Sequence, residues 1–328
     1  MRHIKLFNLI AAAILCLIAI SVFLYLTNDT AQIEIENLED SGKLTISIDD
    51  QTLFVYQYSQ NWDLPHFWPL HSPSGKNMLI QKAQPFPHHR SFWFADTVRL
   101  EEEREVSFYY AYNSGEKIND DAYGPPFRDH IRHIEFTRSD TLGNQAILKE
   151  KLIWEMDESK PVLEEYRDIR IFSLKNREYL IDISFTVTAA FGDVFFLSDS
   201  IHYAWPFLRM HPDFSEENGG TIASDSGATG EKATDMKTAK WIDYSNTVEG
   251  VTEGLAIFQW PDGYSHKWLT REYGCFGPRR PELKNGNPFT LTKGDSLFQR
   301  VGIYVHKGDA KSGKVERIYK DYSNSKFH

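Results

Sequence analysis

Runs of residues that favour β-strands recur along this 328-residue chain, and they limit its fold more than any other feature. Residues 44–48 alternate apolar with polar side chains, and residues 53–58 are rich in strand formers after a polar turn at residues 49–51. Further runs occupy residues 106–110, 133–137, 145–149, 163–172, 179–188, 255–259 and 299–306. Long helical periodicity is missing beyond the N-terminus. The pattern predicts an all-β fold, an antiparallel sandwich or barrel.

An uncharged apolar segment precedes these strands. Residues 9–26 would form a helix about 27 Å long at about 1.5 Å per residue, close to the thickness of a bilayer. Arg2 and Lys5 come before the segment and Asp29 after it, so the positive-inside rule predicts a cytoplasmic N-terminus and an exported main domain. We expect residues 1–27 to be a membrane anchor, with a cleaved signal peptide or lipidation at Cys16 as alternatives.

The rest of the chain is predicted to be one exported domain. Residues 28–42 are interpreted as a linker, residues 43–328 as a single β-sandwich domain, and the Gly-, Ala-, Ser- and Thr-rich residues 219–240 as a mobile loop. Cys275 is the only cysteine beyond the apolar segment, so this domain cannot form an internal disulfide. Its stability must therefore come from a packed core.

Composition excludes several function classes. The formal net charge is -10 and the basic residues do not cluster, which argues against nucleic acid as a partner. The sequence has no Gly-rich phosphate loop, dinucleotide fingerprint or serine-nucleophile elbow, so nucleotide binding and serine hydrolysis are not supported. The 8 Trp and 16 Tyr residues can pack a core, but they can also form flat platforms for sugar rings.

The segment His88-His89-Arg90-Ser91-Phe92-Trp93-Phe94 is the strongest candidate for a functional site. Imidazole serves either as a proton carrier near neutral pH or as a neutral metal ligand. Adjacent residues of an extended segment point to opposite faces, so only one of the two histidines could face a pocket unless the chain turns. The alternative is that these side chains form hydrogen bonds that fix a proline-rich loop.

Several blocks of sequence occur in an order that resembles a bacterial family of unknown function labelled methane oxygenase PmoA-like. The blocks are residues 65–70, 73–75, 87–95, 131–133, 181–183, 241–245, 254–258, 271–274 and 294–297. The resemblance implies a large β-sandwich in the style of the galactose-mutarotase supersandwich, and a setting among carbohydrate-degradation proteins. Methane oxidation is not expected, because a particulate methane monooxygenase subunit spans the membrane several times.

Two sets of side chains are assigned candidate roles. Acid-base catalysis of a sugar reaction needs proton donors and acceptors on either side of the ring, and the candidates are His88, His89, His133, Asp243 and Glu272. Aromatic rings and guanidinium groups suit substrate binding, and the candidates are Arg90, Trp93, Trp241, Tyr244, Trp268 and Arg271. Structural alternatives remain: a turn cap for Asp243, an ion pair for Arg90 and core packing for the tryptophans.

Three function classes follow. The leading one is a membrane-tethered enzyme that acts on a carbohydrate or glycoside by hydrolysis, elimination or epimerisation, without a cofactor. The second is a noncatalytic carbohydrate-binding or scaffold protein. The third is an oxidoreductase in which His88 or His89, together with His133, binds one divalent metal.

Overall fold

The computed structural model describes residues 31–113, 127–197, 203–280 and 289–327. Its strands form four antiparallel sheets, so the predicted all-β, antiparallel fold class is confirmed. The largest sheet has the order β14-β15-β16-β20-β11-β10-β9-β8. Its strands are β8 (His130–Leu142), β9 (Gln145–Met156), β10 (Lys160–Ser173), β11 (Tyr179–Thr188), β14 (Thr221–Ser224), β15 (Trp241–Val248), β16 (Val251–Gln259) and β20 (Ser296–Lys307).

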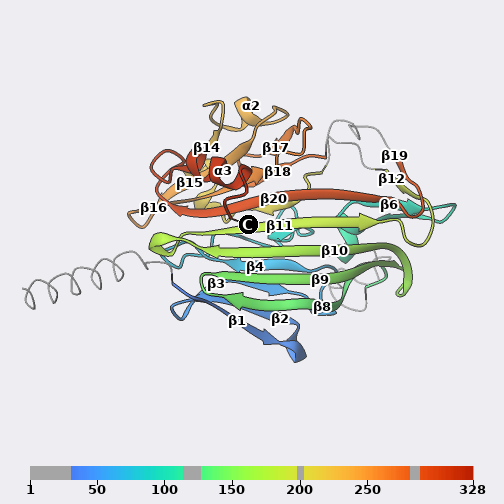
Figure 1. Cartoon of the computed structure of the whole chain (residues 1–328). Coiled ribbons are helices and arrows are strands. Elements are labelled where there is room, and N and C mark those ends of the chain that lie inside the picture. Colours follow the sequence, from blue (N-terminus) through green and yellow to red (C-terminus); the bar gives the residue numbers. More distant parts are fainter. Residues whose placement is uncertain (1–30, 114–126, 198–202, 281–288, 328) are drawn as a thin grey trace, which may run out of the picture.

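Three four-stranded sheets complete the fold (Figure 1). One has the order β1-β2-β3-β4, with β1 (Ile33–Leu38), β2 (Lys43–Ile48), β3 (Gln51–Gln57) and β4 (His66–Leu70). Another has the order β19-β12-β6-β7, with β19 (Phe289–Leu291), β12 (Val194–Phe196), β6 (Thr97–Leu100) and β7 (Glu105–Ser107). The last has the order β17-β18-β13-β5, with β17 (Trp268–Thr270), β18 (Cys275–Pro278), β13 (Phe207–Arg209) and β5 (Phe92–Trp93).

The short helices lie between and after the strands. They are α2 (Glu231–Thr234), α3 (Val315–Ser323) and the 3-10 turns η1 (Glu39–Ser41), η2 (Phe108–Asn113), η3 (Lys175–Arg177), η4 (Pro212–Phe214) and η5 (Glu216–Asn218). Helix α3 lies on the outer face of the eight-stranded sheet (Figure 1). There Tyr319 and Tyr322 pack against Phe258. The inner face of that sheet and the three smaller sheets share one hydrophobic core.

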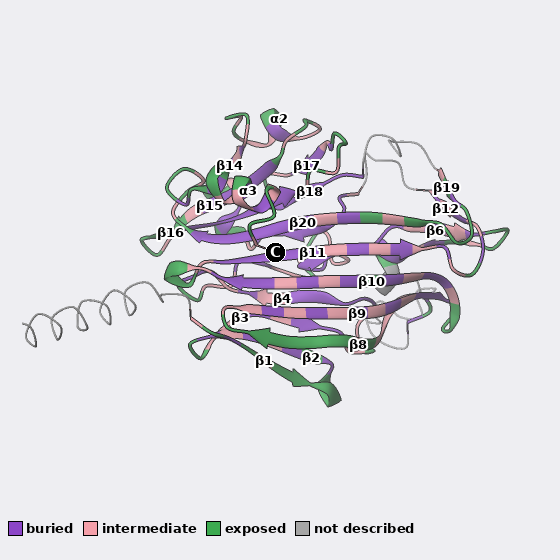
Figure 2. Ribbon diagram, viewed as in Figure 1, coloured by how far each residue is buried: buried purple, intermediate pink, exposed green. Residues whose placement is uncertain are grey.

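Local sequence explains why the long strands form where they do. The turn Asp49-Asp50 joins β2 to β3, and both residues have positive φ, as a two-residue hairpin turn of type I′ requires. Side chains of β9 and β10 alternate between the core and the outer face, because successive strand residues point to opposite sides (Figure 2). The predicted strand at residues 179–188 coincides with β11.

Three predictions about local structure need correction. Within the predicted linker, residues 28–42, the described part from residue 31 onward contains β1, which pairs with β2 and buries Ile33. Residues 219–240 contain β14, which pairs with β15, and α2; their small side chains gave no apolar alternation to reveal a strand. The predicted strand at residues 106–110 ends at Ser107, after which η2 begins.

The predicted membrane anchor, residues 1–27, lies outside the described residues. No helix within the described ranges is long and apolar enough to cross a membrane.

A buried polar network joins two sheets. Tyr56 of β3 donates a hydrogen bond to Glu150 of β9, and Arg167 of β10 donates one to the Tyr56 hydroxyl at 2.9 Å. Arg167 also pairs with Glu165, whose other oxygen accepts a hydrogen bond from the indole of Trp154 at 2.6 Å. Burial raises the pKa of Glu165, and the Arg167 cation acts in the opposite direction. The network therefore fixes β3 against the inner face of the large sheet.

Arg167→Met should lower the free energy of unfolding by about 3–5 kcal/mol, because it leaves Glu165 as an uncompensated charge in the core. Chemical denaturation at 25 °C measures this loss. The control is Arg138→Met, which removes an exposed ion pair with Asp140 and should cost about 0.5 kcal/mol or less. Equal losses in the two variants would show that the network does not join the sheets.

Candidate functional site

The chain turns at the two adjacent histidines. The backbone N–H of Phe86 donates to Ala83, and that of His89 donates to Phe86, so residues 83–89 are not extended. The imidazole centroids of His88 and His89 are 4.5 Å apart, with their planes nearly perpendicular. Both rings therefore enter the same cluster, rather than opposite faces as an extended segment would require.

Aromatic rings from several elements surround the two imidazoles. Phe86 stacks on His89 with centroids 4.9 Å apart, and Tyr110 of η2 lies 4.3 Å from His88. The Tyr109 hydroxyl is 3.1 Å from His89 Nε2. We define the His88–His89 cluster as Phe86, His88, His89, Trp93, Tyr109, Tyr110, Phe207, Arg209, Tyr273 and Cys275.

The cluster has a buried base and a partly exposed rim. His89 and Trp93 are buried at the base. Phe86, His88 and Tyr273 are partly buried, and Tyr110 is exposed. A ligand that rests on the rim would meet aromatic rings and the His88 imidazole.

Burial keeps both imidazoles neutral. It lowers the pKa of His88 to about 4. It also lowers the pKa of His89 to about 2, with smaller contributions from His88 and the Arg209 cation. At pH 7 each ring is neutral and can accept or donate a hydrogen bond.

Cys275 lies beside His89 but does not form an activated nucleophile. Its Sγ is 3.8 Å from His89 Nδ1, and the thiol is fully buried. Burial raises the pKa of this thiol, so both Cys275 and His89 stay neutral. With Tyr109 on the other ring nitrogen, His89 is held from both sides and serves to position the cluster.

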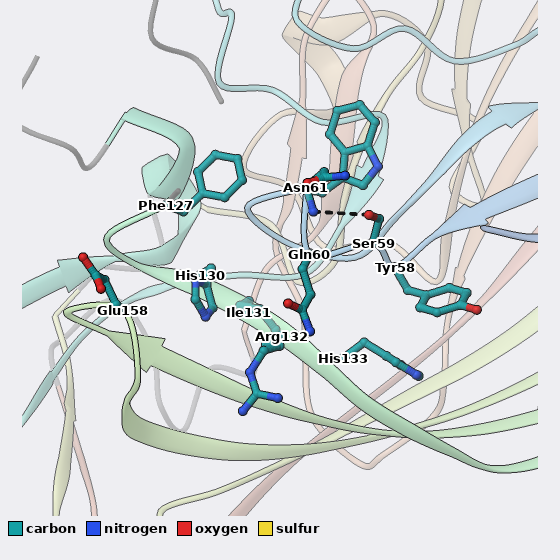
Figure 3. A pocket seen from close by; sticks show the side chains of 11 residues that line it. Tyr58, Ser59, Gln60, Asn61, Phe127, His130, Ile131, Arg132, His133 and Glu158 are labelled. Atoms are coloured by element: carbon teal, nitrogen blue, oxygen red, sulfur yellow. Dashed lines mark hydrogen bonds between the residues drawn. The ribbon is translucent and has the colours of Figure 1, made fainter. Parts of the chain in front are cut away.

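His133 occupies a different place from the two adjacent histidines. It projects from β8, and its Nδ1 lies 2.5 Å from Glu150 of the buried network. Its ring borders a pocket of about 320 Å³ between the start of β8 and the segment after β3, where Gln60 and Asn61 project (Figure 3). Two other residues that line this pocket, His130 and Arg132, form hydrogen bonds with Glu155. Much of the polar lining is therefore already paired within the protein.

The predicted metal site is not assembled. His133 hydrogen-bonds to Glu150, whereas the nitrogens of His89 face Tyr109 and Cys275. Across the part of the chain that the structure describes, no group of three or more His, Cys, Asp or Glu side chains is arranged to hold a metal ion.

Two other predicted side chains, those of Asp243 and Arg90, are buried and pair with other side chains of the core. Asp243 is completely buried in β15 and accepts a hydrogen bond from His306 at 2.7 Å, so it lies within a strand and does not cap a turn. Burial alone would lower the pKa of His306, but the Asp243 carboxylate raises it. Arg90 forms a buried ion pair with Asp63, the structural alternative to ligand binding.

The remaining predicted residues gather around β15 and β17. Tyr244 and Trp268 are buried, and their polar atoms donate to backbone oxygens of Arg271 and Ala239. Trp241 is buried and donates to Glu316 of α3. Arg271 pairs with Asp235 at 2.7 Å. Glu272 is exposed, and its backbone N–H donates to Glu231.

Sequence reasoning missed most of the cluster around the two histidines. Tyr109, Phe207, Arg209 and Cys275 come from distant segments and carry no recognisable motif. One signal in the sequence could have indicated this cluster. Arg209 is a charged residue at the end of the otherwise apolar strand β13.

The family described as "Family of unknown function (DUF6807)" matches residues 43–320, and the chain belongs to this family. This match corrects the label suggested by the blocks of sequence, because nothing supports a PmoA-like assignment. No curated protein matches the sequence.

Solved structures that are similar to the chain share little sequence with it. They include the GH36 α-galactosidase AgaB from Geobacillus stearothermophilus (TM-score 0.48, 10% identity, 85% of this chain and 42% of that chain). A heparan sulfate lyase HepC mutant from Pedobacter heparinus has a TM-score of 0.38 and 11% identity, over 84% of this chain and 37% of that chain. Galactose 1-epimerase from Lactobacillus acidophilus NCFM has a TM-score of 0.37 and 8% identity, and the match covers 85% of this chain and 100% of that chain.

The chain spans about two fifths of the length of the α-galactosidases. These similarities are too weak to transfer a substrate or a catalytic residue.

Stability should fall as pH drops from about 6.5 towards about 4. The unfolded chain binds protons on His88 and His89 near pH 6.5, whereas the folded chain resists protonation until about pH 4 and about pH 2, so protons favour the unfolded state in this window. His89→Gln should flatten this part of a plot of Tm against pH. The control is His211→Gln, which changes a half-exposed histidine outside the cluster. An unchanged slope in His89→Gln would contradict the assignment.

Proposed function

We propose that this protein is a carbohydrate-processing enzyme that binds a sugar ring at the His88–His89 cluster, with His88 as the general base. The observation that carries the proposal is a neutral imidazole on the rim of an aromatic surface, with a second imidazole held behind it.

The rim has the chemistry that sugar rings require. Phe86, Tyr110 and Tyr273 present aromatic faces and edges, on which the C–H faces of a sugar can pack. The Tyr110 and Tyr273 hydroxyls can exchange hydrogen bonds with sugar hydroxyls. Such a mixture of aromatic surface and a few polar groups is typical of small-molecule sites.

The two histidines have different roles in this proposal. His89 has Tyr109 on one nitrogen and Cys275 on the other, so it positions its neighbours. Within the described ranges no hydrogen bond engages the ring nitrogens of His88, which leaves them available to a ligand. Burial keeps His88 neutral at pH 7, the form that a general base needs.

The arrangement favours elimination or epimerisation over hydrolysis. Glycoside hydrolysis ordinarily uses two carboxyl groups on either side of the bond that breaks. Among the described residues, no carboxylate forms a hydrogen bond or an ion pair with a member of the cluster. The same observation keeps a noncatalytic carbohydrate-binding protein as the second candidate.

We also propose that residues 9–26 anchor the protein in a membrane and that the β domain is exported. The support is the uncharged apolar stretch and the basic residues before it. The full-length chain should stay with membranes after extraction in alkaline carbonate, and a variant without residues 1–27 should be released. Release of the full-length chain would contradict the anchor.

His88→Gln should lower turnover of a bound glycan about 100-fold or more, because it removes the general base, while the glycan still binds. Tyr110→Ala should weaken binding about tenfold by removing one aromatic surface. A glycan screen with the full-length chain, followed by calorimetry and NMR detection of product, measures both effects.

The matched control is Phe298→Ala, which removes an exposed aromatic ring from β20 and should change neither quantity. Intact turnover in His88→Gln, with weaker binding in Tyr110→Ala, would exclude His88 as the base. Binding without any turnover in the wild-type protein would favour the noncatalytic candidate. No bound glycan at all would overturn the proposal.

A further inference from the structure

Arg209 is a buried cation that has no carboxylate partner among the described residues. Arg209 is the last residue of β13, and its side chain belongs to the His88–His89 cluster. The residue is only 6% exposed. Its Nε and Nη1 atoms are enclosed and have no hydrogen-bond partner in the part of the chain that the structure describes. No carboxylate among the described residues lies within ion-pair distance of this guanidinium.

The other buried arginines of the described ranges differ in this respect. Arg90 pairs with Asp63, and Arg167 pairs with Glu165. Arg279 lies 3.9 Å from Asp235, and Arg280 lies 3.7 Å from Asp96. This fold therefore places a carboxylate beside each of these buried arginines and leaves Arg209 without one. A buried charge is costly unless it is paired, so the missing counterion points to a ligand.

The surroundings of Arg209 supply no negative charge of their own. Its guanidinium lies over the ring of Tyr273, 4.2 Å from the centroid, a contact that partly offsets the lost hydration. Burial raises the pKa of Tyr273 and of Cys275, so both stay protonated at neutral pH. His89 is neutral as well, which leaves the cluster with the single positive charge of Arg209.

The backbone holds Arg209 in this position. Its N–H donates to the oxygen of Ser91 at 2.7 Å, and its own oxygen accepts a hydrogen bond from Ile80 at 3.1 Å. Ser91 directly follows the His88-His89-Arg90 segment, so the same pairing sets the distance between the cation and the two imidazoles. Such a fixed position is what recognition of a particular ligand group requires.

We propose that the ligand of the His88–His89 cluster is an acidic saccharide, a uronic acid unit whose carboxylate binds to Arg209. This inference rests on the proposed carbohydrate function and names its substrate class. A carboxylate bound to the guanidinium would supply the missing negative charge. Neutral sugars would leave the guanidinium unpaired, so the site selects against them.

The binding test uses the full-length chain and pairs of oligosaccharides that differ only in the acidic group. Trisaccharides of galacturonate, glucuronate, mannuronate and guluronate are compared by calorimetry with their carboxyl-reduced forms and with sulfated neutral trisaccharides. At least one uronate should bind about tenfold tighter than its reduced form, and Arg209→Gln should abolish that difference. Arg209→Lys keeps the charge but loses the planar fork, so it should retain part of the preference.

A second measurement separates a ligand-binding role from a structural one. Arg209→Gln removes an uncompensated buried charge, so the Tm of the unliganded protein should rise by about 2–4 °C. The matched control is Arg90→Gln, which breaks a buried ion pair with Asp63 and should lower the Tm. A fall in Tm for Arg209→Gln would show that Arg209 has a structural partner and would overturn the inference.

The outcomes distinguish this inference from the function on which it rests. Equal binding of uronates and their reduced forms would overturn the acidic-substrate inference and leave carbohydrate binding intact. Sulfated sugars that bind more tightly than uronates would also overturn it, since the ligand group would not be a carboxylate. Failure of every saccharide, acidic and neutral, would overturn the proposed function and this inference together.

Discussion

The buried network of Tyr56, Glu150, Arg167 and Glu165 is the interaction on which the arrangement of the sheets depends. It joins β3 of one sheet to β9 and β10 of another through hydrogen bonds in an apolar core. A buried charge is tolerated only where its partner lies in the correct place, so this network permits one relative position of the two sheets. The rest of the core packs around that fixed position.

Arg209 departs from the rule that the network obeys. The other buried arginines of the described ranges each lie beside a carboxylate. Within the same ranges, the Arg209 guanidinium has no counterion, although it belongs to the cluster that holds two neutral imidazoles. Natural proteins tolerate such a loss of stability at functional sites, where a bound ligand can supply the missing counterion. The exception therefore marks the site more clearly than the histidines do, because a buried histidine often has a purely structural role, as His306 does with Asp243.

Sequence reasoning succeeded for features set by neighbours along the chain. The hairpin of β2 and β3 and the whole of β11 were predictable, because strand alternation and turn residues are local signals. The same reasoning placed Asp243 in a site, although it is buried against His306 from a strand 63 residues away. It also overlooked β14, whose small residues form a strand only because β15 offers an edge.

The sequence by itself determined the all-β class, the main strands and the concentration of imidazole, guanidinium and indole groups near residue 90. Only the tertiary structure decided which of these groups share a site. It turned the chain so that His88 and His89 meet, and it paired Arg90 with Asp63. It also brought Tyr109 and Cys275 beside His89, and it placed Arg209 over the ring of Tyr273 in the same cluster. The physical reason is that pairing between strands far apart in the sequence sets which side chains meet. The residue type at one position does not indicate which distant residue will lie beside it.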